Sequence, residues 1–225
     1  MSVHTCLQSI MNESGLTRKP YIPKTTHSDN IVDMDIQYCL PAAFKRIIGR
    51  RVSVFLGNPV DWASAVALNI SKAGQIAIIT GSIHGMTICA SRSCSSHMIN
   101  SWFVSACRHG HESIVRVLLA LPQHYGVDPS VRDNISLLFA AIHGHDNIVN
   151  ILLDLPLNRG IDPSINDNEV FRYAACYGHE HIIRILLNLP SNRGVNPSAN
   201  DDFSLRVAVK NGHDGITQLL CALSY

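Results

Sequence analysis

The sequence lacks the motifs on which most enzyme classes depend. It contains no Gly-x-Ser-x-Gly turn and no local cysteine-protease signature, so nothing indicates a serine or cysteine nucleophile. It also contains no Gly-x-x-x-x-Gly-Lys phosphate loop and no Gly-x-Gly-x-x-Gly dinucleotide motif. We therefore predict a protein that is not an enzyme and that uses no cofactor.

Excess charge and long apolar runs are also scarce. The chain has 18 Lys and Arg against 17 Asp and Glu, which gives no global attraction to nucleic acid or to membranes. No apolar run has the length of a membrane span, and the first residues lack the basic and then apolar layout of a signal peptide. The seven cysteines are scattered without a Cys-x-x-Cys pair, which indicates reduced thiols. We expect a cytoplasmic protein without nucleic-acid, membrane or small-molecule ligands.

An internal repeat occupies the last 125 residues. The dipeptide Gly-His recurs at 110–111, 144–145, 178–179 and 212–213, so that each interval is 34 residues. An apolar segment follows each glycine, as in GHESIVRVLLALP and GHDNIVNILLDLP, and the segments between them read GVDPSVRDN, GIDPSINDN and GVNPSANDD. A fixed period of this length indicates stacked supersecondary units. Stacked units usually work as binding surfaces.

The repeated residues predict a unit of helix, tight turn, helix and loop. After the glycine, apolar residues such as Ile148, Val149 and Leu152 fall on one face of a helix of about ten residues. Before the glycine, small pairs such as Ala140-Ala141 allow two helices to approach closely. The glycine itself suits the left-handed residue that closes a helix.

The ends of these helices also have candidate signals. Asn134 and Asn168 are predicted N-caps of the first helix in their units. Pro156 and Pro190 are expected to end the second helix, and the Asp-Pro-Ser or Asn-Pro-Ser segment that follows predicts a turn.

These residues resemble the ankyrin-repeat family through the order Ala-Ala, Gly-His, Ile-Val, Leu-Leu and Gly-Val-Asp, in four copies over residues 100–225. The resemblance implies an all-α ankyrin-like helix-turn-helix solenoid that binds another protein through its concave face. Two departures concern the family's β-hairpin finger: Thr-Pro-Leu-His is absent before the first helix, and a longer Leu-Pro-x-x-Arg-Gly loop follows the second. Other helical repeats, of the TPR or HEAT kind, are the alternative folds.

Comparison of the copies suggests where a partner binds. The two residues before each glycine change freely, and in ankyrin-like arrays the corresponding positions line the concave groove together with the loop before the first helix. The alternative is that these sites are exposed and unconstrained. The predicted partner-binding residues are Arg108, His109, Ile142, His143, Cys176, Tyr177, Lys210 and Asn211, with Arg132, Asn166, Glu169, Asn200 and Phe203 from the loops.

The first hundred residues are harder to interpret. We expect residues 1–30 to form a disordered polar tail and residues 31–99 an irregular helical region. Gly74, followed by Ile78 and Ile79, has the glycine and Ile-Val spacing of the repeats, which predicts one decayed repeat at 65–98. A segment at about 38–75, with Leu40-Pro41 and Asp61-Trp62, faintly resembles an F-box. That alternative would make the chain a ubiquitin-ligase substrate adaptor, and ankyrin-like proteins also occur among effectors of intracellular bacteria.

Two groups of histidines are candidates for metal binding. The histidines of the Gly-His pairs belong to stacked units about 8–10 Å apart, too far for a shared zinc ion, so we expect them to fix loops through hydrogen bonds. His84, Cys89, Cys94 and His97 are ligand types that suit zinc, but their spacing matches no known finger. We therefore predict no metal site and interpret the two thiols as buried core residues.

Overall fold

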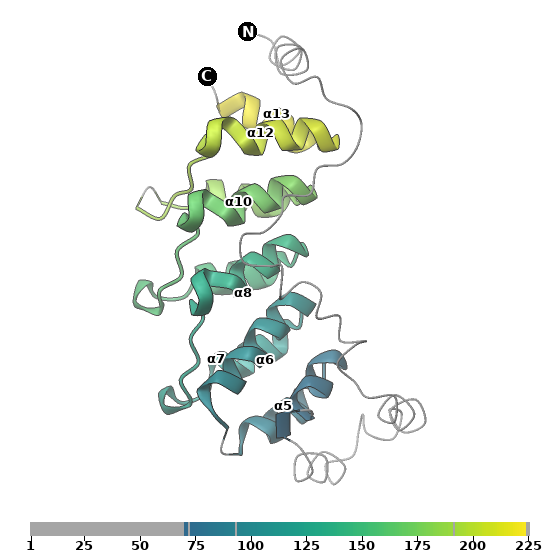
Figure 1. Cartoon of the computed structure of the whole chain (residues 1–225), viewed down its shortest axis with the longest axis vertical. Helices are drawn as coiled ribbons and strands as arrows, with labels where there is room; N and C mark the ends of the chain where they lie inside the picture. The colour runs from purple at the N-terminus through teal and green to yellow at the C-terminus, as the bar shows by residue number, and fades with distance from the viewer. Residues whose placement is uncertain (1–69, 72, 93, 191, 224–225) are drawn as a thin grey trace.

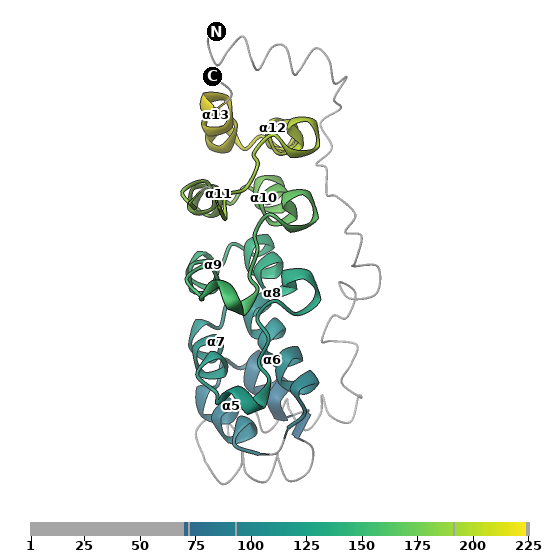
Figure 2. The ribbon, with the colours of Figure 1, turned by 90° about the vertical axis from the view of Figure 1, so that its left-hand side faces the viewer.

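A computed structural model of the chain describes residues 70–71, 73–92, 94–190 and 192–223, and this part contains helices and no strand. The helices form two parallel columns in an elongated stack (Figures 1 and 2). The first helix of each unit lies in one column: α6 (Ser96–His109), α8 (Val131–Ile142), α10 (Ile165–Tyr177) and α12 (Ala199–Asn211). The second helix lies in the other: α5 (Ile83–Ala90), α7 (Glu112–Leu119), α9 (Asp146–Leu153), α11 (Glu180–Leu187) and α13 (Asp214–Leu223). The predicted all-α solenoid is confirmed.

Each first helix ends in the same closed turn. Gly144 has a φ of 72°, and the next N–H, of His145, donates to the carbonyl of Ala140 at 2.9 Å. This bond between residues five apart is the closing bond of a Schellman turn, in which glycine adopts the left-handed conformation without a Cβ clash. The same turn occurs at Gly110, Gly178 and Gly212, where φ lies between 75° and 81°. The predicted role of the glycines is confirmed.

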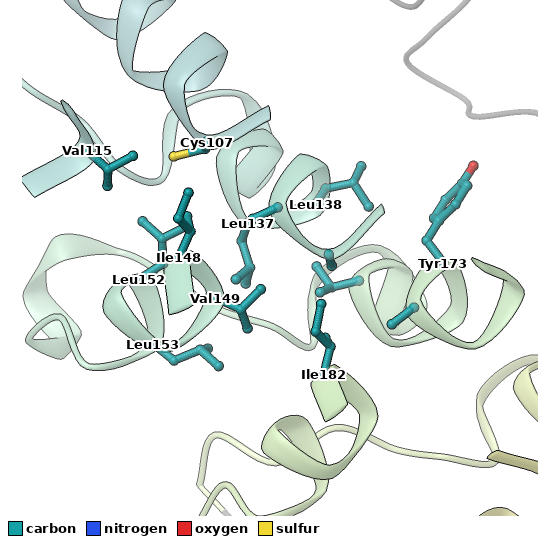
Figure 3. Close-up of a cluster of buried hydrophobic side chains, with 14 of the residues drawn as sticks. Cys107, Val115, Leu137, Leu138, Ile148, Val149, Leu152, Leu153, Tyr173 and Ile182 are labelled. Carbon is teal, nitrogen blue, oxygen red and sulfur yellow. The ribbon is translucent and has the colours of Figure 1, made fainter. Parts of the chain in front are cut away.

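The core runs without interruption between the two columns. Leu137 of α8 lies near Ile148 and Val149 of α9, and Ile182 of the next unit follows below them (Figure 3). Leu152 is fully buried in the same cluster. Three of the second helices, α7, α9 and α11, have 8 residues each rather than the expected ten or so, and each ends three residues before its proline.

A further helix pair precedes the four predicted units. Residues 73–79 are helical and α5 follows, with the turn at Gly81, whose φ is 64°. The N–H of Ser82 donates to the carbonyl of Ala77 at 2.8 Å, which repeats the closing bond of the other turns. The prediction that Gly74 occupies the turn is wrong: Gly74 lies within the helix, where the ring of Trp102 packs against it and leaves no room for a Cβ.

Three left-handed residues precede the regular part of α8, α10 and α12. In α8, Arg132, Asp133 and Asn134 have φ of 50°, 55° and 61°. Outside glycine this conformation is rare, and Asn and Asp adopt it most readily. The prediction that Asn134 and Asn168 are N-caps is wrong, because their side chains bond to the following loop. The amide of Asn134 donates to the carbonyl of Asp162 at 3.1 Å, and Oδ1 of Asn168 accepts from the N–H of Asn196 at 2.8 Å.

The loops between units contain short 3₁₀ turns, η1 (Gln123–Tyr125) and η2 (Leu157–Arg159), and no β-hairpin finger within the described residues. The Asp-Pro-Ser segment turns as predicted, since Oδ1 of Asp128 accepts from the N–H of Ser130 at 2.9 Å. The arginine of the Leu-Pro-x-x-Arg-Gly loop reaches back to the preceding part of the array. Arg159 donates to the carbonyl of Val127 at 3.1 Å, and Arg193 donates to that of Leu153 at 2.7 Å.

Candidate functional site

The histidine of each Gly-His pair joins its unit to the preceding one. Nε2 of His145 lies 2.9 Å from the carbonyl oxygen of Arg108, and since a carbonyl can only accept, the ring nitrogen donates. His179 makes the equivalent bond to Ile142 at 2.8 Å, and His213 makes it to Cys176 at 2.9 Å. The predicted loop-fixing role of these residues is confirmed, with the addition that each bond crosses between units. We call these three residues the anchored histidines.

Each anchored ring also lies on the glycine of the preceding turn. A Cβ built on Gly110 would lie 2.7 Å from Cε1 of His145, and one built on Gly144 would lie 2.7 Å from Cε1 of His179. A Cβ built on Gly81 would lie 3.3 Å from the ring of His111. The ring of His111 therefore packs in the same way against the turn that precedes α5. Glycine is therefore required at these turns for two reasons. Its backbone adopts a positive φ, and the histidine ring packed against it leaves little room for a Cβ.

A second ring stacks on each of His111, His145 and His179. The ring centroids of His109 and His111 are 6.2 Å apart, those of His143 and His145 are 6.0 Å apart, and those of Tyr177 and His179 are 6.5 Å apart. The interplanar angles are 7°, 11° and 14°. His109, His143 and Tyr177 are themselves exposed. We call these three residues the ring row; they lie where α6, α8 and α10 end.

The polar atoms of the two histidines in the ring row are oriented by the backbone. Nδ1 of His109 donates to the carbonyl of Ser105 at 2.8 Å, and Nδ1 of His143 donates to that of Phe139 at 2.9 Å. Nε2 of each neutral ring is then the acceptor. Arg108, which precedes His109, holds its guanidinium 5.4 Å from the centroid of the Phe139 ring.

The pKa of His143 is lowered, first because burial disfavours the charged ring. The hydrogen bond to the Phe139 carbonyl opposes this shift, while the nearby charges of Arg108, His145 and His109 add to it. Burial also raises the pKa of Tyr177, so that its phenol stays protonated and can donate.

The structure divides the predicted partner-binding residues between the two ends of the first helices. Arg132, Asn166 and Asn200 are exposed, but they belong to the left-handed turns at which α8, α10 and α12 begin. The carbonyl of Asn166 accepts from Arg172 at 3.1 Å. These left-handed turns and the ring row lie at opposite ends of the same helices. A partner that contacts both must therefore cross the whole face formed by the first helices.

Two of the predicted partner-binding residues are buried. Cys176 is 3% exposed and Glu169 is 6% exposed, so neither side chain is presented to a partner, and those two predictions are wrong. The cause is the close packing of consecutive first helices, which covers α10 from both sides. Asn211 is half-buried and donates to the carbonyl of Cys176 at 2.8 Å. The side chains of Ile142, Lys210 and Phe203 are also half-buried.

The zinc candidates lie at the start of the described array. Sγ of Cys94 donates to the carbonyl of Cys89 at 3.3 Å, and burial raises the pKa of the Cys89 thiol to about 12. No group of three or more His, Cys, Asp or Glu residues in the described ranges is arranged to hold a metal ion. Most of the F-box-like segment, up to residue 69, lies outside the described residues.

Sequence reasoning missed an open groove between two second helices. It has a volume of about 580 Å³ and lies between α7 and α9. Its lining includes Glu112, Arg116, Asn150, Ile151 and Asp154. One signal could have indicated it: Arg116, Asn150, Arg184 and Gln218 occupy equivalent positions and differ between copies.

Comparison with known proteins identifies the repeated units. The family model for ankyrin repeats, in three copies, matches residues 137–225, which include the second half of α8 and all of the helices after it. Residues 137–225 are therefore ankyrin repeats. A search of curated proteins found no match. In addition to the matched span, the structure shows the same helix-turn-helix packing in α6 with α7. None of the helices in the described residues is long and apolar enough to cross a membrane.

Proposed function

We propose that this chain binds a protein partner through its first-helix face, with the ring row as the main contact. Ankyrin repeats are in general protein-protein interaction modules. The observation that carries the proposal is the stacking of His109, His143 and Tyr177 on histidines that the scaffold fixes. These side chains are exposed, and the residue at this position changes between copies whereas the ring beneath it does not.

Rigid rings are favourable contact residues for a physical reason. Binding costs about 0.5–1.5 kcal/mol for each rotamer-rich side chain that it immobilises. A ring that already stacks on a fixed neighbour has lost that freedom before the partner arrives. Tyrosine and arginine are also enriched among the residues that dominate binding energy, and Tyr177 and Arg108 lie in or beside the ring row.

We also propose that the chain acts by binding rather than by catalysis, since ankyrin repeats are typically non-enzymatic. No disulfide joins the cysteines of the described residues, which are Cys89, Cys94, Cys107, Cys176 and Cys221. Free thiols are the usual state in a reducing compartment, so we propose that the protein works in the cytoplasm.

Affinity capture with matched variants tests the proposed surface. A double variant, His143→Ala with Tyr177→Ala, removes two rings of the ring row. Its control, Asn150→Ala with His181→Ala, removes two exposed side chains from the second helices α9 and α11. We expect the first variant to lose the partners that the unmodified chain captures, while the control retains them and both keep the helical circular-dichroism signal. Loss of the partners with the control alone would move the binding surface to the second helices and the groove beside them.

A further inference from the structure

The ring row lies among groups that are basic or can become basic. The charges that act on His143 are those of Arg108, His145 and His109, and those that act on His111 are those of His109 and His145. Within the described part of the chain, no carboxylate is among the groups that shift the pKa of either ring.

The nearest carboxylates in the sequence belong to the second helices. Glu112 and Glu180 begin α7 and α11, and each pairs with an arginine one turn later on its own helix, at 2.9 Å and 2.7 Å. Asp146 begins α9. The charged face that the ring row presents is therefore set by Arg108 and by the protonation of the imidazoles.

We propose that the ring row binds an acidic segment of the protein partner, whose carboxylates contact Arg108, His109 and His143. This inference rests on the proposed function and specifies the partner's chemistry. A carboxylate can only accept hydrogen bonds, and the Tyr177 phenol and the Arg108 guanidinium can donate to it. Hydrogen bonds between charged donors and carboxylates are about twice as strong as neutral ones.

The hydrogen bonds of the two histidines couple this binding to protonation. Nδ1 of His109 and of His143 already donates to a backbone carbonyl, so Nε2 is the atom left to face the partner. Neutral Nε2 is an acceptor and cannot bond to a carboxylate, whereas protonated Nε2 can donate. The acidic segment must therefore bind with uptake of protons, and its affinity must rise as the pH falls.

Three labelled peptides of twelve residues test this inference on the full chain: one rich in Glu and Leu, one with each Glu replaced by Gln, and one with each Glu replaced by Lys. At about pH 6 the Glu peptide should bind at least about tenfold more tightly than either of the other peptides. This difference corresponds to about 1.4 kcal/mol of binding free energy. The affinity of the Glu peptide should fall as the pH rises from about 5 to about 7, because the pKa of His143 lies below the ordinary imidazole value. Equal binding of all three peptides, or an affinity that rises with pH, would overturn the inference.

Variants locate the binding. His109→Gln with His143→Gln should remove the pH dependence, and Arg108→Gln should remove much of the preference for Glu. His181→Gln, an exposed histidine of α11, should change neither. The inference is overturned if the Glu preference survives in both ring-row variants, or if a twelve-nucleotide single-stranded RNA displaces the Glu peptide at lower concentration than unlabelled peptide does.

The outcomes also separate this inference from the proposed function. If partner capture depends on Tyr177 but the three peptides bind equally, the protein-binding surface stands and the acidic class of partner is wrong. If the Glu peptide binds through the ring row but capture does not depend on the row, the surface for the captured partner lies elsewhere.

Discussion

The anchored histidines and the ring row differ in function although their residues are only two positions apart. His145 and His179 donate to carbonyls of the preceding unit, and histidine stands at this position in all four copies. His143 and Tyr177 stack on them from the solvent side, and there the residue changes between copies. Within one stacked pair of rings, one residue therefore stabilises the scaffold and the other is available for recognition. The inner ring is fixed by its neighbour unit, and the outer ring is free to vary.

The last unit extends the comparison. Gly212 has a φ of 75° and the same closing turn as Gly144, but a Cβ built on Gly212 would meet nothing within 4 Å. His213 is anchored on the preceding unit, while no ring covers the turn at Gly212 in the described structure. In a solenoid each unit is stabilised by its neighbours, so we expect the turn at Gly212 to be the least stable of the series.

The largest expected effect comes from the core beneath both regions. Leu152→Ala should lower the free energy of unfolding by about 2–5 kcal/mol, because Leu152 is fully buried and its removal leaves a cavity. Leu157→Ala is the matched control, since Leu157 is 61% exposed and should have almost no effect. Urea denaturation followed by circular dichroism measures both. A Leu152 variant as stable as the Leu157 variant would contradict the assigned core.

Removal of an anchored ring should lower the free energy of unfolding by less than the core substitution does. It should lower it by more than removal of the ring that stacks on it from the ring row. His179→Ala leaves the half-buried carbonyl of Ile142 without its donor, and we expect a loss of about 1–3 kcal/mol. Tyr177→Ala should remain within about 0.5 kcal/mol of the unmodified chain, as expected for a surface substitution. Urea midpoints decide between them, and a larger loss for Tyr177→Ala would reverse the two roles.

Two glycines allow the contribution of an anchored ring to be measured separately from the backbone requirement. Gly144→Ala and Gly212→Ala both place a Cβ at positive φ, which costs about 1 kcal/mol. Only at Gly144 does the new Cβ also meet a ring, that of His179 at 2.7 Å. We therefore expect Gly144→Ala to destabilise the chain more than Gly212→Ala, as measured by urea midpoints. Equal losses would show that the ring contributes nothing beyond the backbone requirement.

The smallest effect is a dependence of stability on pH. The pKa values of His111 and His143 are lowered, so the unfolded chain binds more protons than the folded chain below the ordinary imidazole pKa of 6.5. Their contribution to stability is present above that pKa and is lost as the pH falls through the lowered values. The urea midpoint should be lower at about pH 5.5 than at about pH 7.5. The drop should be smaller in a His111→Gln, His143→Gln double variant, and an equal drop would contradict the assignment.

The sequence was sufficient to predict what lies within one unit. Periodic apolar residues such as Ile148 and Leu152 determine the buried face of α9, and the repeated glycine determines the left-handed turn, because both depend on neighbours a few residues away. Contacts between units were not predictable in this way. The bond from His179 to Ile142 spans 37 residues, and that from Asn168 to Asn196 spans 28, so each depends on how two units stack.

Two local features were also missed, for different reasons. The first helix pair has its turn at Gly81, 29 residues before Gly110 rather than 34, whereas the spacing from glycine to the Ile-Val pair within a unit pointed to Gly74. The left-handed turns use Asn and Asp residues that equally suit an N-cap, and only the position of the following loop decides between the two uses. For the partner-binding residues, variation between copies indicated exposed positions such as His143 but could not reveal that Cys176 is buried.

Native-state hydrogen exchange at the closing turns tests most directly whether anchored rings hold consecutive units together. The amides of His145, His179 and His213 all donate to an alanine carbonyl, at 2.9 Å, 3.0 Å and 2.9 Å, but only the first two turns are covered by a ring of the following unit. We predict that the His213 amide exchanges at least about tenfold faster, which corresponds to about 1.4 kcal/mol. His179→Ala should speed exchange at the His145 amide in the same way. Equal protection of all three amides, with no change at His145 in that variant, would contradict the account.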